Sequence, residues 1–134
     1  SNVPSAGRLS DAMDAERGRV CLAYGVRHKT FAQHIDTYYG TQGTTAYEAV
    51  TNCKAYQAIG EFPSTIWQDW EKIDVPYAIV PLVRLAEQAG IAVPVHRSLA
   101  EILGVLLGVD PWNCGPTLKD MALEGSPSEV AARF

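Results

Sequence analysis

Residues 98–108, with the sequence Ser-Leu-Ala-Glu-Ile-Leu-Gly-Val-Leu-Leu-Gly, carry the clearest structural signal in the chain. Ser98 is followed three residues later by Glu101, which is the spacing of a capping box at a helix N-terminus. The stretch closes with Gly108, and glycine commonly ends helices. Its apolar residues recur at the spacing of one helix face: Leu99, Ile102, Leu103, Leu106 and Leu107. The stretch therefore predicts a helix that starts after Ser98.

The same signals occur on both sides of this stretch. Ser10 is expected to cap a helix over residues 10–24, which Gly25 ends. Further capping boxes predict four more helices, the last two of them short: Thr30/Gln33, Thr45/Glu48, Thr117/Asp120 and Ser126/Glu129. The first two of these four are expected to end at Gly40 and Gly60.

The centre of the chain has a different pattern. Residues 61–73 contain aromatic residues with little periodicity, which predicts a loop or broken turn. Asp74 is expected to be the N-cap of the next helix, with Pro76 in its first turn and Gly90 at its end. Pro81 lies inside that helix and should kink it. No segment alternates like a strand, so the predicted fold class is all-α.

Composition limits the possible functions. The 134 residues suffice for one domain, and 47% of them are hydrophobic. The net charge is −4 and there is no basic run, which excludes a basic nucleic-acid-binding module. The longest apolar stretches, residues 75–83 and 102–109, are too short to cross a membrane. The odd number of cysteines, three, argues against a disulfide framework and favours reduced thiols in a cytoplasmic protein.

Motifs for a nucleotide or metal site are missing from the sequence. It contains neither G-x-G-x-x-G nor G-x-x-x-x-G-K, so we expect no cofactor to bind to this chain alone. His28, His34 and His96 lack the spacing of metal ligands, so no metal site is expected. We interpret residues 1–8 as a tag remnant and linker, and residues 9–134 as one helical domain.

Asp74 is the acid that stands out from local sequence. It lies between an aromatic-rich segment and an apolar one, where a carboxylate must be capped or paired. On local grounds an N-cap role is favoured over a functional one. For Trp67 and Trp70 a role as lids on the core is favoured over ligand platforms, and Tyr77 is evenly balanced between core and pocket. The charged residues nearby, Asp69, Glu71 and Lys72, are interpreted as solvated. Arg84 and Arg97 are the basic residues best placed for a substrate carboxylate, but a surface role is favoured for both.

The order of several short motifs resembles a known family over residues 9–130. The most specific part is Asp74-Val75-Pro76-Tyr77, followed by Gly90-Ile91-Ala92-Val93-Pro94. The other matching parts are Asp14-Ala-Glu16-Arg17, Tyr24-Gly25, Tyr39-Gly40, the segment from Tyr56 to Pro63, and Leu107-Gly108-Val109-Asp110. Together they resemble the C-terminal helical domain of the octopine/nopaline (opine) dehydrogenases.

The resemblance implies a two-domain oxidoreductase. An N-terminal Rossmann domain, absent from this chain, would bind NAD or NADP, and an all-helical domain similar to that of 6-phosphogluconate dehydrogenase would close over the substrates. The implied reaction joins an α-keto acid to the amino group of an amino acid and reduces the imine. A histidine before the helical domain would act as acid and base, and Asp74 would be the aspartate that pairs with it. His28, His34 and His96 do not match that histidine.

The sequence departs from the family pattern at one substrate position. The family usually has an arginine five residues before the aspartate, where this chain has Asp69. Trp70 and Ile73 replace the family's tyrosine and glutamate. An acid reverses the sign of the local field, so another cation must take the substrate carboxylate, or the substrate carries an amine there. The candidate cations are Lys72, Arg84 and Arg97.

These observations leave two main hypotheses. In the first, the chain is the substrate-binding domain of an opine-dehydrogenase-like enzyme, inactive by itself, in which Asp74 is catalytic and four residues bind substrate: Trp67, Asp69, Trp70 and Tyr77. In the second, it is a non-catalytic interaction or dimerisation module that kept the fold. A weaker third reading is the helical domain of a related hydroxy-acid reductase. A homodimer is compatible with each of them.

Overall fold

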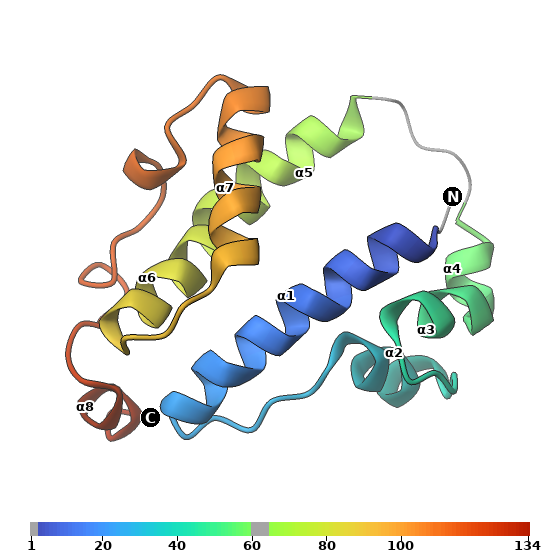
Figure 1. Cartoon of the computed structure of the whole chain (residues 1–134), viewed down its shortest axis with the longest axis horizontal. Coiled ribbons are helices and arrows are strands. Elements are labelled where there is room, and N and C mark those ends of the chain that lie inside the picture. Colours follow the sequence, from blue (N-terminus) through green and yellow to red (C-terminus); the bar gives the residue numbers. More distant parts are fainter. Residues whose placement is uncertain (1–2, 60–64) are drawn as a thin grey trace.

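The computed structural model describes residues 3–59 and 65–134, and within these residues there are helices and turns but no strand. The expected all-α class is confirmed (Figure 1). The elements are α1 (Pro4–Ala23), α2 (Phe31–Tyr39), α3 (Ala46–Asn52), α4 (Lys54–Gln57), α5 (Ile66–Asp74), the π-helical turn η1 (Val75–Ile79), α6 (Val80–Gln88), α7 (Pro94–Leu107), the 3₁₀ turn η2 (Pro111–Asn113) and α8 (Pro127–Ala131). None of the helices in the described ranges is both long and apolar enough to cross a bilayer.

Helix α1 runs through the middle of the molecule (Figure 1). Helices α2, α3 and α4 lie on one side of it, and α5, η1, α6 and α7 on the other. The core has three parts: one joins α1, α6 and α8 around Val20 and Val83, one joins η1 to α7 around Val75, and one joins α2 to α3 around Ile35. Because α1 contacts both sides, it holds the two groups of helices together.

The first helix begins earlier than expected. Pro4 occupies its first turn, so the predicted start at Ser10 is wrong, and residues 4–8 of the expected linker are helical. Proline suits this position because its missing N–H has no partner in a first turn. The expected end is confirmed, since Gly25 follows the helix with a φ of +67°. Tyr24 is buried there, and its hydroxyl donates to the Leu85 carbonyl at 2.9 Å.

Two capping boxes are confirmed in full, at Thr30/Gln33 and Ser126/Glu129. Thr45 also caps α3, but the carboxylate of Glu48 bonds to the backbone and hydroxyl of Thr44 instead. The helix predicted to run from Thr45 to Gly60 is interrupted at Cys53, whose buried side chain sits on extended backbone with ψ of 109°. Gly60 lies outside the described residues.

Two other predicted boxes do not start helices. Thr117 and Asp120 exchange hydrogen bonds, but only turns follow. The predicted start of α7 after Ser98 is wrong, because α7 begins at Pro94. Glu101 instead accepts a hydrogen bond from the Trp112 indole at 2.7 Å.

The central segment also differs from expectation. Residues 66–73, predicted as part of a loop, form α5, while residues 60–64 lie outside the described ranges. Asp74 is not an N-cap, because its own backbone is helical (φ −68°, ψ −36°) and its side chain makes no capping hydrogen bond. The chain passes through Asp74 from α5 into η1 without a new helix start.

The π-helical turn explains how this region tolerates two prolines. Pro76 and Pro81 lack backbone N–H groups and would each remove a hydrogen bond from a regular helix. In η1 the N–H of Val80 bonds to the carbonyl of Val75, five residues back. Pro81 lies in the first turn of α6, directly after η1, where a missing N–H is tolerated.

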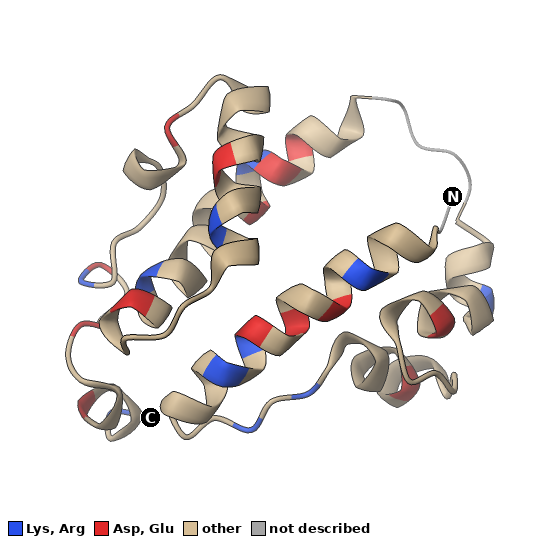
Figure 2. Ribbon diagram, in the orientation of Figure 1, with Lys and Arg blue, Asp and Glu red and all other residues tan. Residues whose placement is uncertain are grey.

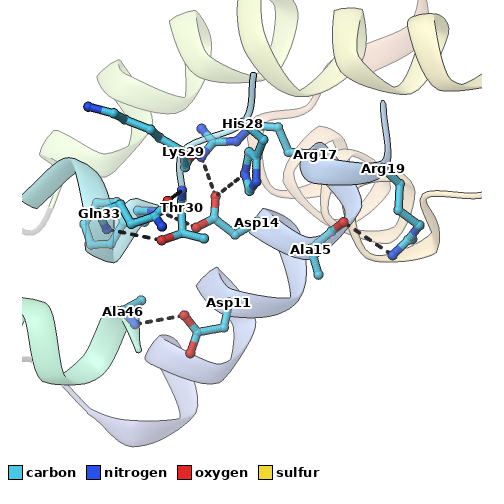
Figure 3. A network of polar contacts seen from close by, with 11 residues as sticks. Asp11, Asp14, Ala15, Arg17, Arg19, His28, Lys29, Thr30, Gln33 and Ala46 are labelled. Carbon is cyan, nitrogen blue, oxygen red and sulfur yellow. Dashed lines mark hydrogen bonds and ion pairs between the residues drawn. The ribbon is translucent and has the colours of Figure 1, made fainter. Parts of the chain in front are cut away.

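Three acids of α1 cap the N-termini of other helices. Asp11 accepts from the N–H of Ala46 at 2.8 Å at the start of α3, and Asp14 accepts from the N–H of Phe31 at the start of α2. Glu16 accepts from the N–H groups of Val95 and His96 at 2.8 and 2.9 Å, at the start of α7. Figure 3 shows Asp11 directed at Ala46, and Asp14 beside Arg17 and His28. The free N–H groups and the positive end of each helix dipole favour these carboxylates.

Glu16 is the most deeply buried of these acids. It is 3% exposed, and its carboxylate lies 2.8 Å from Nδ1 of His96, which is 5% exposed. Burial raises the pKa of Glu16. The N–H groups of Val95 and His96 and the His96 ring together lower it by more than burial raises it, so the pKa lies below its usual value. The folded state therefore favours the ionised form.

Glu16→Gln is expected to cost about 3 kcal/mol of unfolding free energy at pH 7, because a buried charged acceptor is lost. The lowered pKa adds stability that is complete above the ordinary value of 4.5 and is lost as the pH falls through the lower folded value. The difference in unfolding free energy between the original chain and Glu16→Gln, measured by urea titration, should therefore become smaller below pH 4.5. Glu129→Gln, in an exposed local box, is the control and should have a much smaller effect at pH 7. Equal losses for both variants would contradict the role of Glu16.

Candidate functional site

Helix α5 buries none of its residues completely. In the turn η1 that follows, Val75, Pro76 and Ile79 are buried, as is Val80 at the start of α6. The uncovered surface is rich in large side chains: Trp70 is 49% exposed, Ile73 61% and Tyr77 63%. Exposed apolar groups at this density mark interaction surfaces.

The structure brings some of the predicted site residues together. Trp67, Trp70, Glu71 and Asp74 occur at helical positions i, i+3, i+4 and i+7 of α5 and share one face. Trp67 and Glu71 are half-buried on this face, and Trp70 and Asp74 are exposed. We call these four residues the acidic-aromatic face.

Asp69 is not part of this face. It lies five residues before Asp74, which is roughly 140° around an α-helix. Its carboxylate pairs with Lys72 at 3.5 Å, and both side chains are largely exposed. Tyr77 is exposed one turn beyond Asp74, within η1. The structure thus separates Asp69 from the residues with which it was grouped.

Glu71 is a member that sequence reasoning missed. It was interpreted as a solvated loop charge, but burial raises the pKa of its carboxyl and the charge of Asp74 raises it further. The charge of Asp74 one turn away thus disfavours the ionisation of Glu71. Once the segment is known to be helical, the spacing of Trp67, Glu71 and Asp74 predicts that Glu71 lies beside the other two.

The arginines proposed to replace the missing family arginine are engaged elsewhere. Arg84, expected on the surface, is half-buried and donates to the carbonyls of Trp112 and Pro116. Arg97 is exposed, pairs with Glu87 and lies 4.9 Å above the ring of Trp112. None of these contacts of Arg84 and Arg97 involves a residue of the acidic-aromatic face.

The three histidines also have contacts away from Asp74. His28 lies 3.6 Å from Asp14, His96 bonds to Glu16, and His34 stacks on Tyr38 with ring centres 6.4 Å apart. Within the described ranges, no group of three or more His, Cys, Asp or Glu side chains could hold a metal ion. No strand and Gly-rich turn precede a helix in those ranges either, so this part of the chain does not fit a nucleotide diphosphate.

The described residues line several clefts of about 270 to 510 Å³. Trp67, Trp70, Glu71 and Asp74 do not line these clefts of the described part of the chain. Acidic residues mark both α1 and α5 in Figure 2, but those of α1 are used as caps, whereas the Asp74 side chain makes no capping bond. A ligand on this face would need a second surface to enclose it.

Comparison with known proteins places the chain in a family. The family model described as NAD/NADP octopine/nopaline dehydrogenase, alpha-helical domain, matches residues 2–107. The chain belongs to the octopine/nopaline dehydrogenase family. Its resemblance to that family, stated from short motifs, is therefore confirmed, while the likeness to 6-phosphogluconate dehydrogenase stays a prediction.

Relatives of this opine dehydrogenase domain are bacterial. Vitopine synthase of Allorhizobium ampelinum is 31% identical over 124 residues, and the opine dehydrogenase of an Arthrobacter species is 28% identical over 123 residues. Each alignment covers 92% of this chain and 34% of the relative. Protein ocs of Agrobacterium tumefaciens is 28% identical over 131 residues, which cover 98% of this chain and 36% of the relative. The chain thus spans about a third of the length of these relatives.

The coupling of Glu71 to Asp74 can be measured directly. Asp74→Asn removes the neighbouring charge and is expected to lower the pKa of Glu71, which should nevertheless stay above its ordinary value because burial is the larger cause. Carboxyl ¹³C chemical shifts followed against pH report this pKa. Asp69→Asn, on another side of α5, is the control and should leave Glu71 unchanged. A larger change from the Asp69 variant would contradict the proposed face.

Proposed function

We propose that this chain is the substrate-binding helical domain of an NAD- or NADP-dependent opine-dehydrogenase-like enzyme, which condenses an α-keto acid with the amino group of an amino acid and reduces the product. One observation carries the proposal: a face with two tryptophans and two acids stands on a helix without buried residues, directly beside a turn in which Val75, Pro76 and Ile79 are buried. Within residues 3–59 and 65–134, Trp70 and Asp74 on this face stay exposed. A second domain would complete this face.

In this proposal Asp74 pairs with a histidine contributed by the other part of the polypeptide. A carboxylate bonded to an imidazole fixes the tautomer of the ring and stabilises its protonated form while a proton moves to or from the substrate. Such a pair works best away from water. Asp74 is exposed in this chain, so the covering domain would bring both the histidine and the exclusion of water.

The remaining residues of the face would shape the substrate site. Trp67 and Trp70 offer apolar and stacking surfaces beside Asp74, and Tyr77 adds a phenol one turn further on. Asp69 points elsewhere on α5, so its effect on the substrate would be a longer-range electrostatic one. The nucleotide would be held by the other domain of the same polypeptide, in the cytoplasm.

A second candidate function is a non-catalytic interaction or dimerisation module. The engagement of Arg84 and Arg97 favours it, because both guanidinium groups already bind other parts of the chain and Lys72 pairs with Asp69. In that case the exposed aromatic residues would bind a partner protein or a second copy of the chain. The sequence encoded before Ser1 distinguishes the two: a strand, G-x-G-x-x-G and a linker histidine favour the enzyme.

Asp74→Asn in the parent protein is expected to lower kcat by roughly two to four orders of magnitude, because the histidine loses its charged partner. Binding of the nucleotide, measured by fluorescence titration, should not change. The control is Asp36→Asn, which removes an exposed acid of α2 and should leave both quantities unchanged. An unchanged kcat in the Asp74 variant would contradict the catalytic role.

The 134-residue chain alone is expected to be inactive, because it provides neither the nucleotide site nor the proposed histidine. The measurement is oxidation of NADH or NADPH in the presence of an α-keto acid and an amino acid. The full-length parent serves as the positive control. Turnover by the isolated chain above a no-enzyme blank would contradict the proposed division of the site.

A further inference from the structure

The segment after α7 runs back over the π-helical turn. We call residues 109–116 the strap. Gly115 of the strap has a φ of +78°, a conformation that favours glycine. A Cβ atom at this position would lie 2.6 Å from both Cβ and the carbonyl oxygen of Pro76. The strap thus lies so close to η1 at Gly115 that a residue with a side chain would clash with Pro76.

The strap is fixed on both sides of this contact. At its start Pro111 packs on Gly104 of α7, where an added Cβ would lie 2.6 Å from the proline ring. Arg84 of α6 donates to the Pro116 carbonyl at 3.1 Å and to the Trp112 carbonyl. The Trp112 side chain packs against both the η1 and the α6 parts of the core. These contacts leave little room for Gly115 to withdraw from Pro76.

Two prolines remove backbone hydrogen-bond donors at the turn under the strap, η1, and in the helix that follows it. Pro76 and Pro81 cannot donate backbone hydrogen bonds, so contacts from outside must help to hold η1. Asp74 lies two residues before Pro76 and Tyr77 directly after it. A change in the shape of η1 would rotate α5 relative to the core, and would turn Asp74 and Trp70 with it.

We propose that the strap is a positioning element, in which Gly115 and Arg84 set the direction of Asp74 through the shape of η1. This inference rests on the proposed function, because positioning matters only if Asp74 meets a substrate or a histidine. The strap lies after residue 107, where the match to the family model ends.

The test compares Gly115→Ala with Gly90→Ala. Both glycines have positive φ, +78° and +70°, but a Cβ at Gly90 meets no atom within 4 Å. The two variants share the backbone cost, and only Gly115→Ala presses on Pro76. In the 134-residue chain, amide NMR shifts of Asp74, Tyr77 and Ile79 should move in Gly115→Ala alone. In the parent enzyme, kcat should fall roughly ten- to hundredfold in Gly115→Ala, with an unchanged KM for the nucleotide.

The outcomes separate the two proposals. If the η1 amides move while kcat matches that of Gly90→Ala, and Asp74→Asn still lowers kcat, the strap has no positioning role and the proposed function stands. If Asp74→Asn leaves kcat unchanged, the proposed function fails and the positioning role fails with it. If Gly115→Ala does not fold, Arg84→Lys decides by the same two measurements, because lysine cannot hold both carbonyls as arginine does. A smaller loss of kcat in Arg84→Lys supports the positioning role of the strap. An unchanged kcat in this variant overturns that role.

Discussion

The structure depends on carboxylates of one helix that cap three others. Asp11, Asp14 and Glu16 of α1 accept hydrogen bonds from the first turns of α3, α2 and α7, at sequence separations of 35, 17 and about 80 residues. Free N–H groups at a helix start need acceptors, and buried ones are costly to leave unmet. Each acid therefore fixes both the start of a helix and its position against α1. The hydrophobic clusters fill the space that these caps define.

Sequence reasoning succeeded where a helix end is set by near neighbours. The boxes at Thr30 and Ser126 involve partners three residues apart, and Gly25 provides a local end. The predicted start of α7 was wrong because the carboxylate that caps this helix belongs to Glu16, about 80 residues away in the chain. The nearby Glu101 accepts from the Trp112 indole instead. A pattern within one segment cannot distinguish these two arrangements.

The candidate site was identified in part. Short motifs and the resemblance pointed to Asp74, which lies on the exposed face beside Trp70, but its environment was misjudged because α5 was taken for a loop. Ile66, Trp70 and Ile73 recur at the i, i+4 and i+7 spacing of one helix face, but this short pattern was interpreted as irregular, and α5 buries none of its residues. Without the helix, the pairing of Glu71 with Asp74 and the separation of Asp69 from both could not be deduced.

The charges on the acidic-aromatic face restrict what can cover it. Burial and the charge of Asp74 together raise the pKa of Glu71. A domain closing over them would remove solvent from both, and two carboxylates one turn apart cannot both stay ionised in a drier site without a counter-charge. Arg84 and Arg97 are committed to the strap and to Glu87, and so do not supply one here. A surface that covers both acids would therefore either leave Glu71 protonated, as its raised pKa favours, or bring positive charge of its own.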